Sequence, residues 1–175
     1  MKVYNTIENC RVCNSKNFTE VIKIDDQYLS PTFVKSNKDN ELSNVKVPHT
    51  LVFCQDCHLL QLKETVNPDL LYKQYFYRSA VNDTMREDLK KVVVDVSSRV
   101  DLNDGDYVVD IGANDCTMIS YYPDNLNRCG VEPAENIDWS HVRNVKIVND
   151  YFNEDSIRKA VDNNKVKIFT SCAMF

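Results

Sequence analysis

The sequence contains little glycine, no long apolar run and no excess of basic residues. Only 3 of its 175 residues are glycine, and its 26 aspartates and glutamates outnumber its 21 lysines and arginines. With a net charge of -5 and a pI near 5.2, the chain lacks the positive surface through which proteins gain affinity for phosphate backbones. We therefore expect no nucleic acid partner.

The apolar runs are a few residues long, as at residues 92–94, whereas a helix needs about 20 apolar residues to span a bilayer. The first residues, MKVYNTIENCRVC, contain no apolar run of signal-peptide length. We therefore expect a cytoplasmic protein with no membrane association. Disulfides rarely persist in that reducing compartment, and the odd total of 7 cysteines also fits a disulfide framework poorly.

Four cysteines form two CxxC pairs, Cys10 with Cys13 and Cys54 with Cys57. Each pair lets one tight turn present two thiolates to an ion, and two such turns complete a tetrahedral shell without an open position. This pattern predicts a structural zinc site that holds together a module of about 60 residues, whose own core would be too small. The 40 residues between the pairs exceed the usual spacing of about 15 to 20. We expect an insertion there, with a strand at residues 20–24 and a polar tip loop at residues 36–44.

Other interpretations of these cysteines remain open. The thiols could be incidental. The run CQDCH, which ends at His58, has the form of a c-type haem attachment site, but haem would leave the first pair unexplained. A redox CxxC is expected at a strand-to-helix turn, which neither pair has. We expect His58 to be a neighbour of the thiolates or an exposed side chain, and His49 and His141 to be structural or surface residues.

The middle of the chain has the pattern of an amphipathic helix. Thr84 to Glu87 has the form of a capping box, so the helix is expected to begin there or one turn earlier. A turn at residues 101–106 that contains Gly105 would follow its end. The apolar stripe of this helix recurs at steps of 3 and 4: Val81, Met85, Leu89, Val92, Val96 and Val100.

Strand-like and helix-like segments alternate in the rest of the chain, which predicts an α/β fold with a parallel sheet and helices on its faces. Ligands of such sheets bind at the carboxyl ends of the strands. The expected strands are residues 107–111, 128–132, 144–148 and 166–170, and the expected crossover helices lie within residues 116–127, 134–143 and 153–164.

The turn after the first of these strands, VVDIGANDCTM, has too few glycines for a loop that cradles phosphates. A dinucleotide fold would have G-x-G-x-x-G, whereas here Gly112 is followed by Asn114 and Cys116. The carboxylates of Asp110 and Asp115 would repel a pyrophosphate. They suit the ammonium and sulfonium groups of S-adenosylmethionine.

Glu132 ends the second strand, 20 residues after Gly112, which is the separation at which an acidic side chain reaches ribose hydroxyls. Together with the loop, it favours binding of an adenosine cofactor over the alternative, a plain core strand.

In this order, the segments CRVCNS, LVFCQDCHLLQL, YFYRS, VVDIGANDCT, GVEP and NDYF resemble motifs of one family. It is the family of S-adenosylmethionine-dependent C-methyltransferases of deoxysugar nucleotide biosynthesis that carry an N-terminal zinc-binding domain. The resemblance implies a zinc-binding module at residues 1–70 that helps to form the nucleotide-sugar site. A connecting segment with the amphipathic helix would span residues 71–104. Residues 105–175 would form the N-terminal half of a Rossmann-like class I methyltransferase domain.

The resemblance also implies residue roles. Zinc would be bound by Cys10, Cys13, Cys54 and Cys57. The methionine moiety would be lined by Asp110, Gly112 and Asn114, and the ribose would be bound by Glu132. The cofactor and substrate cleft would be covered by Tyr75, Tyr77 and Ser79. Alternatively, the tyrosines would pack between the two domains.

Two departures from the family affect these expectations. Cys116 stands where the family usually has glycine, so it would be strained if its φ is positive. The chain stops at IFTSCAMF, and we expect it to be truncated before the catalytic base, for which no residue is nominated. A completing C-terminal chain or an oligomer would then be needed.

The sequence thus predicts a C-methyltransferase that acts on a nucleotide-linked keto-deoxysugar. One alternative is a non-enzymatic zinc-binding module that recruits a partner. The other is a different α/β enzyme with a zinc appendage.

Overall fold

The computed structural model describes residues 2–30 and 45–174, so the tip loop expected at residues 36–44 lies outside the described residues. The chain divides into two compact units, Met1–Tyr75 and Phe76–Phe175, and each is considered by itself. In the described part of the chain, no helix is both long enough and apolar enough to cross a membrane.

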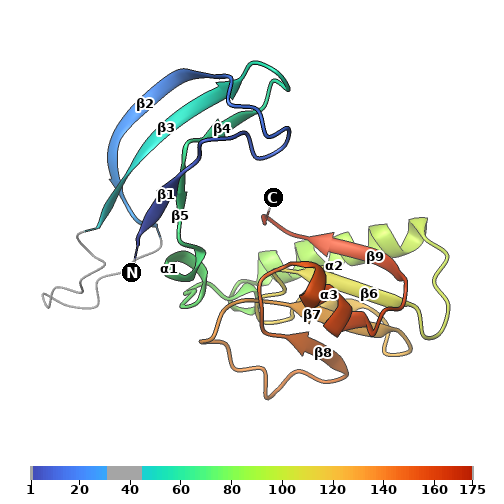
Figure 1. Ribbon diagram of the computed structural model, residues 1–175. Coiled ribbons are helices and arrows are strands. Elements are labelled where there is room, and N and C mark those ends of the chain that lie inside the picture. Colours follow the sequence, from blue (N-terminus) through green and yellow to red (C-terminus); the bar gives the residue numbers. More distant parts are fainter. Residues whose placement is uncertain (1, 31–44, 175) are drawn as a thin grey trace, which may run out of the picture. The chain divides into compact units, whose positions relative to one another are not determined.

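Unit 1 consists mainly of antiparallel strands, followed by one short helix (Figure 1). One sheet has the order β2-β3-β4, and β1 pairs with β5. The strand expected at residues 20–24 is confirmed, because these residues lie within β2. The elements are β1 (Tyr4–Thr6), β2 (Phe18–Tyr28), β3 (Lys46–Cys54), β4 (Leu60–Leu62), β5 (Glu64–Val66) and α1 (Pro68–Tyr72).

The apolar core of unit 1 is small. Among its described residues, the buried apolar side chains are Cys10, Leu29, Val47, Val52 and Cys54. Two of these five belong to the CxxC pairs. Because so few aliphatic side chains are removed from water, a module of this size needs another source of stability.

Unit 2 begins with a short 3-10 turn, η1 (Ser79–Val81), and the helix α2 (Asp83–Arg99). The capping box expected at Thr84 to Glu87 is wrong, because the N-cap is Asn82, whose side chain accepts the backbone N–H of Met85 at 3.3 Å. Asn82 has extended backbone angles, which are typical of an N-cap. The helix therefore starts one residue before Thr84.

The buried face of α2 also differs from the expected stripe. Leu89 and Val93 are buried, with Val96 and Val100 packed against the same cluster. Val81, Met85 and Val92, which the sequence pattern placed on that face, are 81%, 38% and 40% exposed. Val81 precedes the helix, and Val92 is rotated by about 100° from Val93 because a helix has 3.6 residues per turn.

The sheet of unit 2 is four-stranded and parallel, with the order β8-β7-β6-β9, and it makes the fold Rossmann-like. All four expected strands are confirmed, with bounds that shift by at most one residue: β6 (Tyr107–Ile111), β7 (Asn127–Val131), β8 (Val145–Val148) and β9 (Val166–Ser171).

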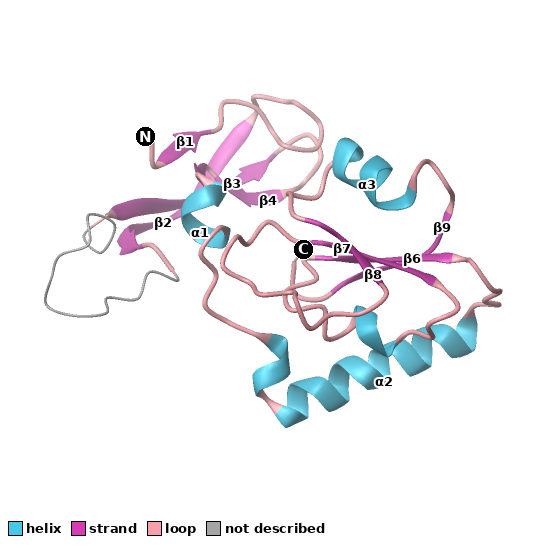
Figure 2. Ribbon diagram, turned by 90° about the horizontal axis from the view of Figure 1, so that it is seen from below, coloured by secondary structure: helices cyan, strands magenta, loops and turns pink. Residues whose placement is uncertain are grey.

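Helices cover both faces of this sheet, with α2 on one side and α3 on the other (Figure 2). Successive side chains of a strand point to opposite faces, and β6 shows this directly. Val108 belongs to the cluster that contains Leu89 and Val93 of α2, whereas Val109 packs in a second cluster with Ala160 and Val161.

One of the three expected crossover helices forms. It is α3 (Glu154–Val161), whose N-terminus has a capping box in which Asn153 and Ser156 exchange hydrogen bonds. The helix expected within residues 116–127 is wrong, since only the 3-10 turn η2 (Ile119–Tyr121) is present. Pro123 favours an extended residue before it, and Tyr122 indeed has ψ 148°.

The helix expected within residues 134–143 is also wrong. Here side chains bond to the local backbone instead: the Asp138 carboxylate accepts the N–H of Ser140 at 2.9 Å. Such turns compete with helix formation.

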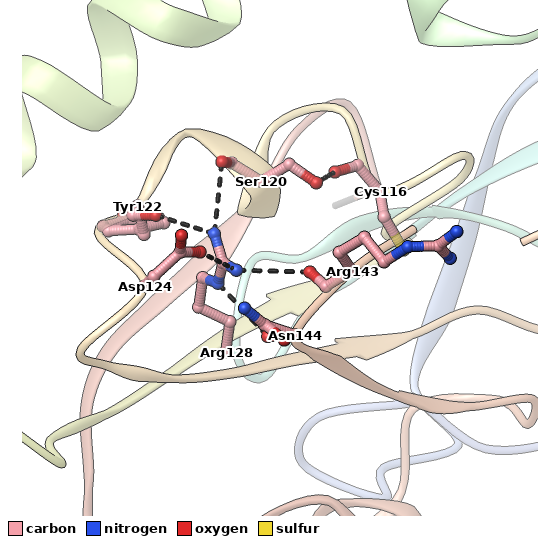
Figure 3. A network of polar contacts seen from close by, with 7 residues as sticks. All are labelled: Cys116, Ser120, Tyr122, Asp124, Arg128, Arg143 and Asn144. Atoms are coloured by element: carbon pink, nitrogen blue, oxygen red, sulfur yellow. Dashed lines mark hydrogen bonds and ion pairs between the residues drawn. The ribbon is translucent and has the colours of Figure 1, made fainter. Parts of the chain in front are cut away.

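A buried arginine holds these irregular connections in place (Figure 3). The side chain of Arg128, at the start of β7, is 5% exposed and pairs with the carboxylate of Asp124. Its guanidinium also donates to four backbone carbonyls, at 2.9 to 3.3 Å, which belong to Ser120, Tyr122, Arg143 and Asn144. Since no α-helix forms in these segments, the side chain of Arg128 supplies the hydrogen bonds that their carbonyls would otherwise lack.

Candidate functional site

The four cysteines of the CxxC pairs converge in unit 1. The sulfur atoms of Cys10 and Cys57 are 3.6 Å apart, those of Cys13 and Cys54 are 3.5 Å apart, and all four lie within 4.8 Å of one another. With a Zn–S bond of about 2.3 Å, a tetrahedral site needs sulfurs about 3.8 Å apart. The cluster therefore fits a zinc ion with no open coordination position.

The two CxxC turns have the same backbone structure, which explains how they present their sulfurs. In the first turn, Asn14 donates its N–H to Cys10 O at 3.0 Å, and in the second His58 donates to Cys54 O at 2.9 Å. Asn14 and His58 have left-handed φ angles of 61° and 64°. Each chain segment therefore reverses immediately after its second cysteine.

The position of His58 follows from this geometry. It occupies the left-handed residue of the second turn, and its ring stacks on Phe53 with centroids 5.7 Å apart and planes 13° apart. Its nitrogens are not part of the four-atom cluster. Because Cys54 and Cys57 lie beside the sulfurs of Cys10 and Cys13, the geometry favours a shared metal over haem attachment or incidental thiols.

Hydrogen bonds favour a thiolate at the first cysteine of each pair, whereas the neighbouring sulfurs and burial raise the pKa of Cys13, to about 12, and that of Cys57. The backbone N–H of Cys13 is the largest influence that lowers the pKa of Cys10, to about 6, and Gln61, whose Nε2 lies 3.2 Å from Cys10 Sγ, contributes. Similarly, the backbone N–H of Cys57 lowers the pKa of Cys54. Thiolates are the form of cysteine that binds metals.

In unit 2, the loop after β6 turns sharply at Gly112, whose φ is +70°. A Cβ atom at this position would lie 2.5 Å from Met174 Cγ and 2.6 Å from Met174 Sδ, so a larger residue would displace Met174. The loop also has positive φ angles at Asn114 (50°) and Cys116 (65°). The expected strain at Cys116 is thus confirmed, since a cysteine there adopts a conformation that favours glycine.

Asn114 is the most connected residue of this loop. Its backbone N–H donates to Glu132 Oε2 at 2.8 Å, and its backbone carbonyl accepts the indole N–H of Trp139 at 2.9 Å. Its side-chain amide donates to the carbonyl of Tyr77 at 3.1 Å and accepts the N–H of Ser79 at 3.3 Å. The side chain is therefore directed at the YFYRS segment.

Glu132 follows β7 and is 6% exposed. Its second carboxylate oxygen, Oε1, accepts the N–H of Ala134 at 2.9 Å. Asn149, beyond β8, donates to the backbone carbonyls of Glu132 and Ala134 at 2.7 and 2.8 Å. The carboxylate is thus held in one orientation at the carboxyl end of the sheet.

Asp110, near the end of β6, is 3% exposed. Burial raises its pKa to about 7, and the nearby charge of Glu132 acts in the same direction, whereas the hydroxyl of Thr170 opposes the shift. Thr170 lies opposite Asp110 in the pairing of β6 with β9, and its Oγ1 donates to Asp110 Oδ1 at 2.8 Å.

Three buried carboxylates therefore meet around the loop, those of Asp110, Asp115 and Glu132. All three act on the same group: after burial, which has the largest effect, their charges help to raise the pKa of Cys116 to about 12. This part of the sheet edge is negatively charged. It lies at β6, where the strand order reverses: β7 and β8 follow on one side of β6, and β9 lies on the other. Open α/β sheets bind ligands at such switch points.

Of the aromatic segment, Tyr77 and Ser79 reach the loop through their backbone atoms, as the bonds to Asn114 show. Tyr75 is the last residue of unit 1, where its ring lies 6.3 Å from that of Tyr72.

Sequence reasoning missed the parts played by Trp139 and Thr170, and it saw Asp115 only as a charge. The Asp115 carboxylate accepts the N–H and hydroxyl of Thr117 and the N–H of Ala80. The bond to Thr117 is a local Asp turn that the sequence could have indicated. The Thr170 contact depends on strand pairing, which no local pattern shows.

Comparison with known proteins agrees with this geometry. Residues 10–72 match a family model described as "Putative zinc binding domain". Over 136 residues, 77% of this chain, the sequence is 26% identical to the C-methyltransferase NovU of Streptomyces niveus. The chain spans about a third (32%) of that protein's length. These similarities confirm the resemblance to C-methyltransferases with an N-terminal zinc-binding domain.

Proposed function

We propose that this chain binds S-adenosylmethionine and contributes to a C-methylation reaction. The observation that carries the proposal is the set of three buried carboxylates, Asp110, Asp115 and Glu132, around a glycine turn at the carboxyl edge of a parallel sheet. The similar Streptomyces protein is a C-methyltransferase, and methyl transfer is the chemistry that S-adenosylmethionine supplies.

The charge of the site distinguishes between cofactors that bind Rossmann-like sheets. A dinucleotide presents a pyrophosphate to the turn after the first strand, and that turn normally offers glycine N–H groups to it. Here the N–H of Asn114 is already taken by Glu132, and the surrounding side chains are carboxyl groups, which offer no donors to a pyrophosphate when ionised. Such a site suits a cofactor with a sulfonium and an ammonium group.

We assign roles in that site as follows. Asp110 and Gly112 would line the methionine moiety, together with the backbone of Asn114, because the Asn114 side chain is directed at Tyr77 and Ser79. Glu132 would bind the ribose hydroxyls. Tyr77 and Ser79, in the same unit, would lie over the cofactor and substrate.

Four thiolates would fill the coordination shell of zinc, so the metal would stabilise unit 1 without taking part in chemistry. Bound S-adenosylmethionine supplies an electrophilic methyl group. The substrate we propose is a nucleotide-linked keto-deoxysugar, because a carbon next to a keto group becomes nucleophilic once a base removes its proton. None of the described residues is nominated as that base.

Calorimetric titration of the purified, zinc-quantified chain with S-adenosylhomocysteine, the demethylated product, tests this proposal. We expect binding at one site per chain with one zinc per chain. NADH is the matched control, since its pyrophosphate should be repelled. Binding of NADH without binding of S-adenosylhomocysteine would favour a different α/β enzyme.

The second candidate function is a zinc-binding module that recruits a partner without catalysis. It is favoured by the thioether of Met174, which covers Gly112 where the methionine moiety would lie. In that case neither compound would bind although zinc is present.

A further inference from the structure

We propose that Asn114 and Asp115 are positioning residues that couple the cofactor loop to residues 77–80, the first part of unit 2 after unit 1. The inference rests on the proposed function for the identity of the ligand, but the coupling itself is carried by contacts within unit 2.

Residues 77–80 depend on the loop for their hydrogen bonds. The carbonyl of Tyr77 accepts from the Asn114 amide at 3.1 Å, and the N–H of Ser79 donates to the same amide at 3.3 Å. The N–H of Ala80 donates to Asp115 Oδ2 at 2.8 Å. Three backbone groups are thus satisfied by side chains of residues 35 to 37 positions away and not by a helix or sheet ladder.

The loop, in turn, is held in an unfavourable conformation. Asn114 and Cys116 have φ angles of 50° and 65°, a region that non-glycine residues adopt at a free-energy cost. Such a conformation persists when surrounding contacts enforce it. The contacts here come from Glu132 on one side, through the N–H of Asn114, and from residues 77–80 on the other.

Asn114 therefore connects the two sides directly. Its backbone is bonded to the carboxylate proposed to bind ribose, and its side chain is bonded to the segment that leads from unit 1. A ligand that fixes the loop through Glu132 should therefore also restrict the motion of residues 77–80. The coupling is reciprocal: the factor by which the ligand stabilises the contacts of this segment is also the factor by which loss of those contacts weakens ligand binding. Cofactor binding would thus restrict the backbone motion of residues 77–80, the segment that follows the zinc-binding unit.

Hydrogen exchange of the Ser79 and Ala80 amides, measured by NMR on the intact zinc-loaded chain, tests the coupling without any ligand. In Glu132→Gln, an NH2 group replaces one carboxylate oxygen. This group cannot accept the backbone N–H to which that oxygen was bonded. We expect exchange of the two amides to become about tenfold faster, as for loss of one hydrogen bond. The amides of Val109 and Val131, inside the sheet, should keep their protection and so show that the fold is intact.

Asp138→Asn is the matched control, because Asp138 also accepts a backbone N–H, that of Ser140, but forms no hydrogen bond with residues 77–80. It should leave the Ser79 and Ala80 amides unchanged. If Glu132→Gln leaves them unchanged as well, while Asp115→Asn accelerates them, the segment is held by the loop but is not coupled to Glu132, and the proposal is overturned.

A ligand experiment then separates the coupling from the proposed function. S-adenosylhomocysteine should slow exchange at Ser79 and Ala80 in the unsubstituted chain, and Asp115→Asn should weaken its binding about tenfold by lowering the competent fraction of the loop. Unchanged affinity in Asp115→Asn would contradict the proposal. If the unsubstituted chain does not bind the compound, the proposed function fails, and the Glu132→Gln result still decides the coupling.

Discussion

The carboxylate of Glu132 accepts the backbone N–H of Asn114 at 2.8 Å, so the end of β7 fixes the loop that follows β6. Neighbouring parallel strands end at the same edge of the sheet, which is why residues 18 positions apart can meet there. The bond places an acid and a strained turn together at the edge where we propose the cofactor binds.

Replacement of Glu132 by alanine should weaken binding of S-adenosylhomocysteine by about 1 to 3 kcal/mol, because charge-assisted bonds to the ribose and support for the loop are lost. Isothermal titration calorimetry measures this change. Glu87→Ala, on the exposed side of α2, is the control and should bind as the unsubstituted chain does. Equal affinity of the two variants would remove Glu132 from the site.

Cys54→Ser should abolish the single bound zinc per chain and unfold unit 1, since the remaining core is small and three thiolates hold zinc poorly. Metal analysis and the NMR amide signals of β3 report the two effects. Cys172, an exposed cysteine outside the cluster, provides the control: Cys172→Ser should retain zinc. A folded Cys54→Ser variant without metal would show that zinc does not stabilise the unit.

The stability of unit 2 should fall as pH rises from about 4 to about 7 and then level off. Asp110 ionises near 3.9 in an unfolded chain, but burial raises its folded-state pKa to about 7. Within this window the folded state binds the extra proton, so rising pH favours unfolding, by a few kcal/mol at most.

Urea unfolding followed by the fluorescence of Trp139, the single tryptophan, measures this dependence. Asp110→Asn should flatten the decline, whereas Asp101→Asn, at an exposed position, should preserve it. The same slope in both variants would mean that another group is responsible.

Arg128→Lys should destabilise unit 2 by about 2 to 4 kcal/mol, because an ammonium cannot reproduce the fork that serves four carbonyls and Asp124. Arg143→Lys is a matched control. Its exposed guanidinium donates to the nearby carbonyl of Ser140, and its replacement should change stability by no more than about 0.5 kcal/mol. Equal urea midpoints for the two variants would contradict the structural role of Arg128.

The sequence predicted those features that depend on neighbouring residues. The four strands of unit 2 are short apolar runs, and each was found within one residue of its expected bounds. The CxxC turns likewise bring two sulfurs together through a few residues, so the cluster of four needed only the two turns to meet. The positive φ of Cys116 was indicated by a comparison of one position with a family pattern.

Tertiary structure decided the rest. The crossovers at residues 116–127 and 134–143 have helix length but form no α-helix. Pro123 favours an extended residue before it, Arg128 binds backbone carbonyls of both segments, and Asp138 accepts the N–H of Ser140. Likewise, the sequence predicted that Asn114 lines the methionine moiety, but only the folded structure shows that its side chain binds residues 77–80. Local patterns determine which segments can be strands or metal-binding turns, since hydrophobic period and turn geometry act over a few residues. Which polar groups meet at the sheet edge depends on strand order and pairing, and these are set by the whole folded unit.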